Sequence, residues 1–315
     1  MRHLKVLTVL IASLFFIVGC SSDSASNETE PKQETATEST EVETESEEST
    51  KREGDEDHRI ISTTVAITEI IEALDLDLVG IPTTYKDLGP RYRDLPDVGR
   101  ADQPDMEIVK SLNPTDVLSV TTLQSDVEEY YEQTNTPVTF LDLESVDGML
   151  ESILLLGEKY NRMEEAEEIV AKFDKQMEEI EEATKDKEAP TVLILLGVPG
   201  SYLVATENSY LGDLARRAGA VNVFPGEDGV EYTSANPEYL QQTNADVILR
   251  AAHGMPDEVV EMFDKEFAEN DIWKHFDAVK NGRVYDLEET LFGTTANLAS
   301  YDALKHLLEI LYEDE

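Results

Sequence analysis

Cysteine and basic residues are both scarce in this sequence. The 315 residues include one cysteine, Cys20, so no disulfide can form within the chain. Lysine and arginine number 25 against 68 aspartates and glutamates, and the formal net charge is −43 at pH 7. A nucleic-acid partner is excluded, because binding phosphate needs a basic surface.

Histidine and the glycine motifs of enzymes are scarce as well. Apart from one residue near the start, the histidines are His58, His253, His275 and His306. A receptor for a free metal ion needs three or four clustered ligands, and these four are widely separated. Gly197-Val198-Pro199-Gly200 lacks the full dinucleotide-binding pattern, and no Gly-x-Ser-x-Gly elbow occurs. We therefore predict that the protein is not an enzyme.

The apolar run near the N-terminus is too short to span a membrane. Basic residues precede this run, Val6 to Val18, which closes on Gly19-Cys20. A membrane-spanning helix needs about 20 apolar residues. A charged start, a short apolar stretch and a small residue before the cysteine are typical of a signal peptide. We predict that residues 1–19 are removed and that Cys20 carries lipid chains, which anchor the protein to a membrane.

An acidic segment follows the predicted lipid anchor. Residues 21–57 include 14 acidic and 3 basic side chains and almost no large apolar ones. Such a segment cannot bury enough surface to offset the entropy lost on ordering. We predict that residues 20–57 are a lipidated cysteine followed by a disordered linker.

Strand-like runs alternate with helical patterns in the rest of the chain. The runs are Arg59–Ser62, Leu78–Ile81, Asp116–Val120, Val138–Leu141, Val192–Leu196, Tyr202–Ala205, Val247–Leu249 and Val284–Leu287. Between the two sets, the segment from Glu158 to Ala189 has no glycine or proline and places apolar residues at helical spacing. The pattern predicts an α/β protein with parallel sheets. We expect two Rossmann-like lobes, residues 58–161 and 188–315, joined by one long backbone helix over 162–187.

Polar residues gather just beyond several predicted strands. Ligands of open α/β sheets bind there, beyond the carboxyl ends of the strands. Thr63-Thr64-Val65-Ala66 begins a predicted helix whose free N–H groups can hold an anion. Thr83-Thr84-Tyr85-Lys86 follows the second strand, and His253 lies beyond a later one. These loops are the candidate site.

One short unit occurs twice in the chain. Pro104-Asp105-Met106-Glu107 leads to the strand at Asp116, and Asn236-Pro237-Glu238 leads likewise to the strand at Val247. Each glutamate falls in the first turn of a predicted helix, where the helix dipole favours an anion. The repetition indicates two related lobes.

Five blocks of sequence carry a family resemblance. They are Thr63-Thr64-Val65-Ala66, Pro82-Thr83-Thr84-Tyr85-Lys86, the run from Val198 to Thr206, His253-Gly254-Met255-Pro256 and the run from Asn270 to Phe276. From Arg59 onwards the chain resembles the haem-binding lipoproteins of iron-regulated surface determinant systems. These are a branch of the helical-backbone (class III) substrate-binding proteins of ABC importers.

The resemblance implies that haem b is the transported ligand and lies between the lobes. In the family a methionine of the N-lobe and a histidine of the C-lobe bind the iron, and His253 matches that histidine. The implied propionate-binding residues are Val65, Ala66, Thr84 and Tyr85. Nearby Lys86 or Arg91 would offset the repulsion between an anionic ligand and an acidic protein.

The chain departs from the family at the methionine position, which Asp102 occupies. A carboxylate is a harder ligand than a thioether, so the sixth position on the iron stays open. Met106, one turn away, is one alternative ligand. A carboxylate, a water molecule or five-coordinate iron are the others. A siderophore or cobalamin receptor on the same scaffold is the alternative function.

The resemblance also implies partners and a location. Relatives dock to their permease through one surface glutamate on each lobe, and Glu107 and Glu238 match these positions. The expected partners are haem, an ABC permease with its ATPase, upstream surface haem-binding proteins and, through the lipid, a membrane. The implied location is the extracytoplasmic face of a Gram-positive cell membrane, where haem is captured for iron acquisition.

Overall fold

The computed structural model describes residues 58–226, 229–234, 237–240 and 242–312, without the side chains of Pro237 and Glu238. Cys20, the predicted signal peptide and the predicted linker lie outside the described residues. Within the described ranges, no helix is both long enough and apolar enough to cross a membrane.

The N-terminal lobe is built on a four-stranded parallel sheet with the strand order β2-β1-β5-β6. Its strands are β1 (Ile60–Ser62), β2 (Leu78–Gly80), β5 (Asp116–Val120) and β6 (Val138–Leu141). Its helices are α1 (Val65–Ala73), α2 (Gly89–Tyr92), α3 (Met106–Ser111), α4 (Gln124–Thr134) and α5 (Val146–Lys159), with a 3₁₀ turn η2 (Thr121–Leu123) before α4. Two short strands, β3 (Gly99–Arg100) and β4 (Gln103–Pro104), form a separate hairpin. The predicted parallel sheet of this lobe is confirmed.

The C-terminal lobe contains a six-stranded sheet with the main order β10-β8-β7-β11-β12. Its strands are β7 (Thr191–Val198), β8 (Ser201–Ala205), β9 (Val221–Asn222), β10 (Tyr232–Ser234), β11 (Val247–Ala252) and β12 (Val284–Leu287). The helical segments are α7 (Tyr210–Arg217), α8 (Pro237–Leu240), α9 (Pro256–Glu269), η3 (Trp273–His275), α10 (Asp277–Lys280) and α11 (Ser300–Tyr312). Strands β9, β7, β11 and β12 are paired in parallel.

The prediction of purely parallel sheets is wrong for two strands of this lobe. Strand β8 pairs antiparallel with β7, and β10 pairs antiparallel with β8. Only Pro199 and Gly200 connect β7 to β8, and Gly200 has a φ of 84°. A parallel pair needs a crossover of a dozen or more residues, so this two-residue turn forces a hairpin.

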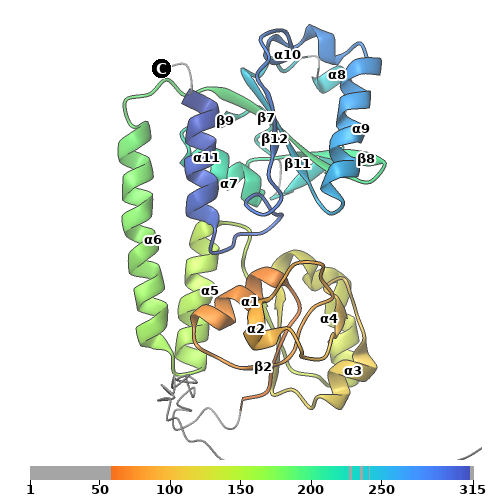
Figure 1. The fold of residues 1–315 in the computed structure, drawn as a ribbon, viewed down its shortest axis with the longest axis vertical. Coiled ribbons are helices and arrows are strands. Elements are labelled where there is room, and N and C mark those ends of the chain that lie inside the picture. The colour runs from red at the N-terminus through yellow and green to blue at the C-terminus, as the bar shows by residue number, and fades with distance from the viewer. Residues whose placement is uncertain (1–57, 227–228, 235–236, 241, 313–315) are drawn as a thin grey trace, which may run out of the picture. The chain divides into compact units, whose positions relative to one another are not determined.

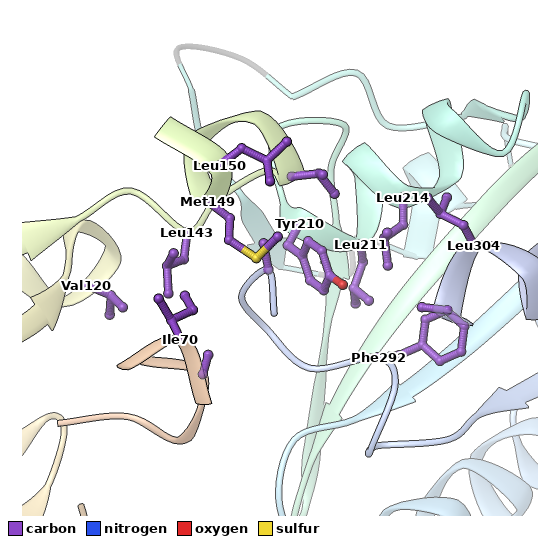
Figure 2. Packing of buried hydrophobic residues seen from close by; sticks show 14 of the residues in the cluster. Ile70, Val120, Leu143, Met149, Leu150, Tyr210, Leu211, Leu214, Phe292 and Leu304 are labelled. Atoms are coloured by element: carbon purple, nitrogen blue, oxygen red, sulfur yellow. The ribbon is translucent and has the colours of Figure 1, made fainter. Parts of the chain in front are cut away.

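The central strands of the C-lobe bury both faces. In β7, Ile194 and Leu196 face the larger hydrophobic core, while Leu193 and Leu195 face a second core that includes Trp273. This division follows from the two-residue period of a strand. The larger core contains side chains from both lobes, such as Ile70 and Leu143 with Tyr210 and Phe292, as Figure 2 shows. One continuous apolar core therefore stabilises the junction of the lobes.

A long helix, α6 (Met163–Thr184), joins the lobes in the chain and packs against α5 and α11 (Figure 1). Its 22 residues span about 33 Å at 1.5 Å per residue. The buried residues Ala166, Phe173 and Ile180 recur every seven positions on one side of it. Helix α6 begins later than the unbroken run from Glu158 suggested, because the left-handed Asn161 (φ 56°) ends α5.

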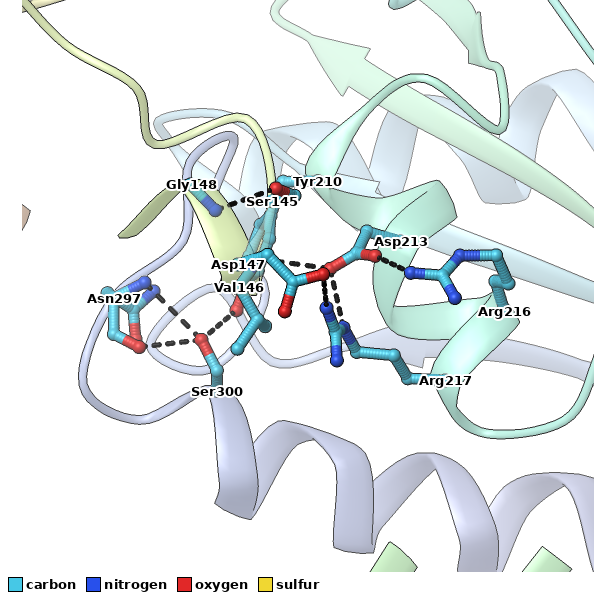
Figure 3. A network of polar contacts seen from close by, with 10 residues as sticks. All are labelled: Ser145, Val146, Asp147, Gly148, Tyr210, Asp213, Arg216, Arg217, Asn297 and Ser300. Carbon is cyan, nitrogen blue, oxygen red and sulfur yellow. Dashed lines mark hydrogen bonds and ion pairs between the residues drawn. The ribbon is translucent and has the colours of Figure 1, made fainter. Parts of the chain in front are cut away.

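Polar contacts also connect the lobes, around the buried Asp213 of α7 (Figure 3). Asp213 Oδ2 accepts a hydrogen bond from Val146 N at the start of α5 (3.0 Å) and from Arg217 Nε (2.9 Å). Arg216 pairs with the other oxygen, and Arg217 also reaches Asp147 at 2.7 Å. The first turn of a helix has free N–H groups, so this carboxylate of one lobe caps a helix of the other.

Candidate functional site

The first part of the candidate site is the N-terminus of α1, at the carboxyl end of β1. Thr64 caps the helix, because its Oγ1 accepts from Ile67 N at 3.2 Å. Buried Thr63 donates to Leu118 O at 3.0 Å and so fixes the turn to the neighbouring strand β5. Val65 and Ala66 are the first two residues of the helix, whose N–H groups have no acceptor within it. These groups are placed to bind an anion.

The loop after β2 supplies Thr84 and Tyr85. Thr84 Oγ1 accepts from Lys86 N at 3.0 Å, which forms a tight turn and leaves the hydroxyl hydrogen free to donate. Tyr85 is 71% exposed, and its hydroxyl donates to Glu289 of the C-lobe. Partial burial, together with the nearby Glu289 carboxylate, raises the pKa of Tyr85 to about 12. Tyr85 is therefore a neutral donor at physiological pH.

The arginines that follow this loop are paired with carboxylates. Arg91 binds Asp75 and Asp77, which lie between the end of α1 and the start of β2. This is the opposite end of α1 from Thr64, so the expectation that Arg91 balances the charge of a ligand at the helix N-terminus is wrong. Arg93 pairs with Asp87.

Lys86 lies near Glu69 of α1. Desolvation raises the pKa of Glu69, and the Lys86 ammonium lowers it in part. Lys86 therefore lies beside α1 and remains the candidate for attracting an anionic ligand.

Asp102 lies at the tip of the β3–β4 hairpin. Arg100 pairs with Gln103 across the hairpin, so Ala101 and Asp102 form its two-residue turn. Arg100 donates from Nε to Oδ1 (2.9 Å) and from Nη2 to Oδ2 (2.7 Å) of Asp102. These bonds hold the pKa of Asp102 below its usual range, and His253 lies near enough to lower it further. The structure thus brings Asp102 of one lobe close to His253 of the other.

His253 begins the loop between β11 and α9. Its backbone N–H donates to Gly197 O at the end of β7 (2.8 Å), and its side chain is exposed. The next two residues, Gly254 and Met255, have left-handed backbones with φ of 74° and 49°. This sharp turn allows the chain to leave the strand and enter α9 directly after the imidazole.

Sequence analysis did not identify Glu289, which lies in the loop after β12. One of its carboxylate oxygens accepts from the Tyr85 hydroxyl and from Gly254 N, the latter at 3.2 Å. A glutamate among 68 acidic residues carries no distinctive sequence signal. Its position at the carboxyl end of a strand beside β11 was the only available indication.

Other predicted residues have packing roles. Met106 packs against the N-lobe cluster that includes Val98 and Val109, which favours a structural role over iron binding. Trp273 is fully buried and His275 is exposed in η3, as the sequence predicted for both.

Two of the blocks that carry the family resemblance meet at Glu266 of α9. Its Oε1 accepts from Tyr202 Oη (3.1 Å), Asn270 Nδ2 (2.8 Å) and Trp273 Nε1 (3.2 Å). Phe267 stacks on Trp273 with ring centroids 4.2 Å apart. These blocks therefore stabilise the C-lobe.

The two candidate docking glutamates lie at the starts of helices. Glu107 is exposed in the first turn of α3, which Asp105 caps through its bonds to Glu107 N (3.0 Å) and Ile108 N (3.1 Å). Glu238 is the second residue of α8, and its side chain lies outside the description.

Three carboxylates approach one another where the lobes meet. Glu231 precedes β10 in the C-lobe, while Asp142 and Glu144 follow β6 in the N-lobe. Glu144 accepts a hydrogen bond from Thr121 Oγ1 at 2.8 Å. Among the described residues, nothing donates to the buried Oε1 of Glu231. Burial raises the pKa of Glu231 to about 7, and the charges of Glu144 and Asp142 add to this effect.

This raised pKa predicts a stability that depends on pH. The folded state holds the proton of Glu231 more tightly than the unfolded chain, so the contribution of this group is full below pH 4.5 and is lost as the pH rises through about 7. We expect Glu231→Gln to raise the melting temperature at about pH 8 and to have little effect near pH 4.5. Thermal unfolding over this range tests the prediction, with exposed Glu188→Gln as the control. A pH-independent effect of Glu231→Gln would contradict it.

Comparison with known proteins follows from this geometry. The family model for periplasmic binding proteins matches residues 60–291. The chain belongs to this family. It is also 45% identical to the high-affinity heme uptake system protein IsdE of Staphylococcus aureus strain Newman over 316 aligned residues, which cover all of both chains.

Two solved structures of such proteins are similar to this periplasmic binding protein. S. aureus IsdE complexed with heme is 49% identical with a TM-score of 0.78, over 81% of this chain and 99% of that one. An ABC transporter substrate-binding protein from Listeria monocytogenes EGD-e is 50% identical with a TM-score of 0.77, over 82% of this chain and 99% of that one. The predicted class III fold with two lobes is confirmed.

Proposed function

We propose that this periplasmic binding protein captures haem between its two lobes and delivers it to an ABC importer for iron acquisition. The observation that carries the proposal is the approach of Asp102 to His253 across the lobes. These are the positions at which the resemblance expects the two iron ligands. The relative whose name refers to heme uptake is similar over its whole length, which supports the same cargo.

The proposed site treats the two ends of haem differently. The N–H groups of Val65 and Ala66 at the start of α1, with Thr84 and Tyr85 in the next loop, bind the propionates. A helix N-terminus and neutral donors suit carboxylates, because they neutralise charge without adding a mobile counter-ion. The predicted cargo is haem b, whose two propionates match this set of donors.

The proposed iron ligand of the C-lobe is His253, in its neutral form. On the opposite side, Asp102 or a water molecule that it orients occupies the sixth position. An anionic oxygen ligand favours ferric over ferrous iron, whereas a thioether favours the reduced state. Arg100 keeps Asp102 ionised by donating to both carboxylate oxygens, each of which retains a further lone pair.

A titration of the purified protein with haemin tests the function. We expect a saturable shift of the Soret band with one haemin per protein. A protein that gives no shift but binds ferric siderophores or cobalamin would replace haem by one of these cargoes on the same scaffold.

Asp102→Met tests the iron ligand of the N-lobe. A thioether opposite imidazole is expected to give a low-spin, six-coordinate spectrum and a higher reduction potential than the wild type. Absorption spectra and a redox titration measure both quantities. Met106→Leu is the control and should match the wild type, because Met106 packs in the N-lobe. An unchanged spectrum for Asp102→Met would show that position 102 does not reach the iron.

We also propose that the protein works from the extracytoplasmic face of a Gram-positive cell membrane. In this proposal residues 1–19 are removed, lipid on Cys20 forms the anchor, and residues 21–57 form the linker to lobes 58–161 and 188–315. Tethering raises the effective concentration of the cargo-loaded lobes at the permease. Upstream surface haem-binding proteins supply the haem, and an ABC permease with its ATPase receives it.

Glu107 and Glu238 are the proposed contacts with the permease, one at the start of a helix in each lobe. We expect Glu107→Ala combined with Glu238→Ala to abolish haem-dependent growth in cells while haemin binding by the purified protein stays unchanged. Exposed Glu129→Ala combined with Glu258→Ala removes the same charge elsewhere and should import normally. Normal import by the first double variant would reject these two contacts.

A further inference from the structure

A single carboxylate, that of Glu289, joins the two halves of the candidate site. Its Oε1 accepts from the Tyr85 hydroxyl in the N-lobe and from Gly254 N in the C-lobe. Tyr85 belongs to the loop of the proposed propionate donors, and Gly254 directly follows His253. One side chain therefore connects the loops that hold the two ends of the proposed cargo.

The turn that carries Glu289 is itself firmly placed. Leu291 N and Phe292 N both donate to Glu288 O at 3.0 Å, and the Phe292 ring is fully buried in the core shared by the lobes. A few residues further on, Ala296 N donates to Leu143 O of the N-lobe at 2.8 Å. The carboxylate thus projects from fixed backbone.

The loop of His253 depends on contacts of this kind. Left-handed backbone is unfavourable for a residue with a side chain, such as Met255. His253 N bonds to Gly197 O on one side, and Gly254 N bonds to Glu289 on the other. Without Glu289, the second of these contacts is lost and the turn is held from one side only.

We infer that Glu289 is a positioning residue that ties the Tyr85 loop to the His253 loop, so that the site is formed before the cargo enters. Pre-ordered groups lose less conformational entropy on binding, and the gain appears mainly as slower release. The competing role for Glu289 is a gate that occupies donors needed by an anionic cargo. A gate predicts the opposite sign, namely tighter binding when the carboxylate is removed.

The first test needs no cargo. Hydrogen exchange measured by mass spectrometry on the ligand-free full chain is expected to speed up in both loops, 83–86 and 253–256, in Glu289→Ala. Glu289→Gln retains a carbonyl acceptor for both bonds and should exchange like the wild type. Glu288→Ala removes the same charge from the same turn, where Glu288 accepts from Thr290 only, and should change neither loop. Faster exchange confined to 253–256 would overturn the tie between the lobes.

The second test follows the release of haemin to an excess of a haem scavenger, and it rests on the proposed function. We expect release from Glu289→Ala to be about tenfold faster than from the wild type, the size of one charge-assisted hydrogen bond. Tyr85→Phe should release about threefold faster. The double variant should match Glu289→Ala, because both changes break the same tie.

Slower release from Glu289→Ala, or fully additive effects in the double variant, would overturn the inference. If the wild type fails to bind haemin, the proposed function fails, and the exchange measurement still decides whether Glu289 ties the loops.

Discussion

His253→Ala is expected to abolish the characteristic Soret shift and to weaken the affinity for haemin by more than about a hundredfold. The loss of groups that only orient a metal ligand costs about 10–100-fold, so loss of the ligand itself should exceed this range. His253 also stands alone in its loop, because the following residues offer no second strong ligand with the same placement. Absorption titration of the variant beside the wild type measures both effects.

The matched control is His275→Ala. His275 is exposed in η3, within a turn that packs on the second core of the C-lobe, and its variant should bind haemin normally. His253→Gln distinguishes a lost ligand from a disturbed loop, because it keeps a polar side chain of similar length without imidazole. Retention of the wild-type spectrum by His253→Ala would exclude this residue as the iron ligand.

Asp213→Ala is expected to lower the free energy of unfolding by about 3 kcal/mol, the cost of leaving a buried charge without its partner. The side chains of Asp213 and Arg217 are only 7% and 13% exposed, so the pair is poorly screened by water. The variant also removes the acceptor for Val146 N at the start of α5. Because this contact joins the lobes, the affinity for haemin should fall as well.

Denaturant unfolding measures the stability, and two variants define the cause. Asp213→Asn keeps an acceptor for Val146 N but loses the charge, so its loss should be smaller than that of Asp213→Ala. Asp147→Ala removes the exposed partner of Arg217 and should cost less than about 1 kcal/mol. Equal losses for Asp147→Ala and Asp213→Ala would contradict a special role for the buried carboxylate.

The architecture was largely predictable, because strand periods and helix lengths are local properties. Strands β5 and β6 agree with their predicted bounds, and α6 agrees with the predicted long helix to within three residues at each end. Purely parallel pairing was the error, since a short turn between two apolar runs outweighed the general α/β pattern at Pro199-Gly200.

The candidate site was predictable in part. Strand-end position singled out the Thr64, Tyr85 and His253 loops, because the topology of a parallel sheet brings strand ends to one edge. The partners of individual charges were not predictable. Arg91 binds carboxylates at the far end of α1, and Arg100 binds the very residue that replaces the family methionine.

The sequence by itself determined the two-lobed class of fold, the acidic character and the residues that offer imidazole and anion-binding groups, because composition and periodicity are carried by the chain directly. Only the tertiary structure decided which of these groups meet. Asp102 faces His253, Glu289 bridges Tyr85 and Gly254, and Asp213 caps α5, each across more than sixty positions of sequence. Such contacts depend on how two lobes pack around a common core, and no local pattern encodes them.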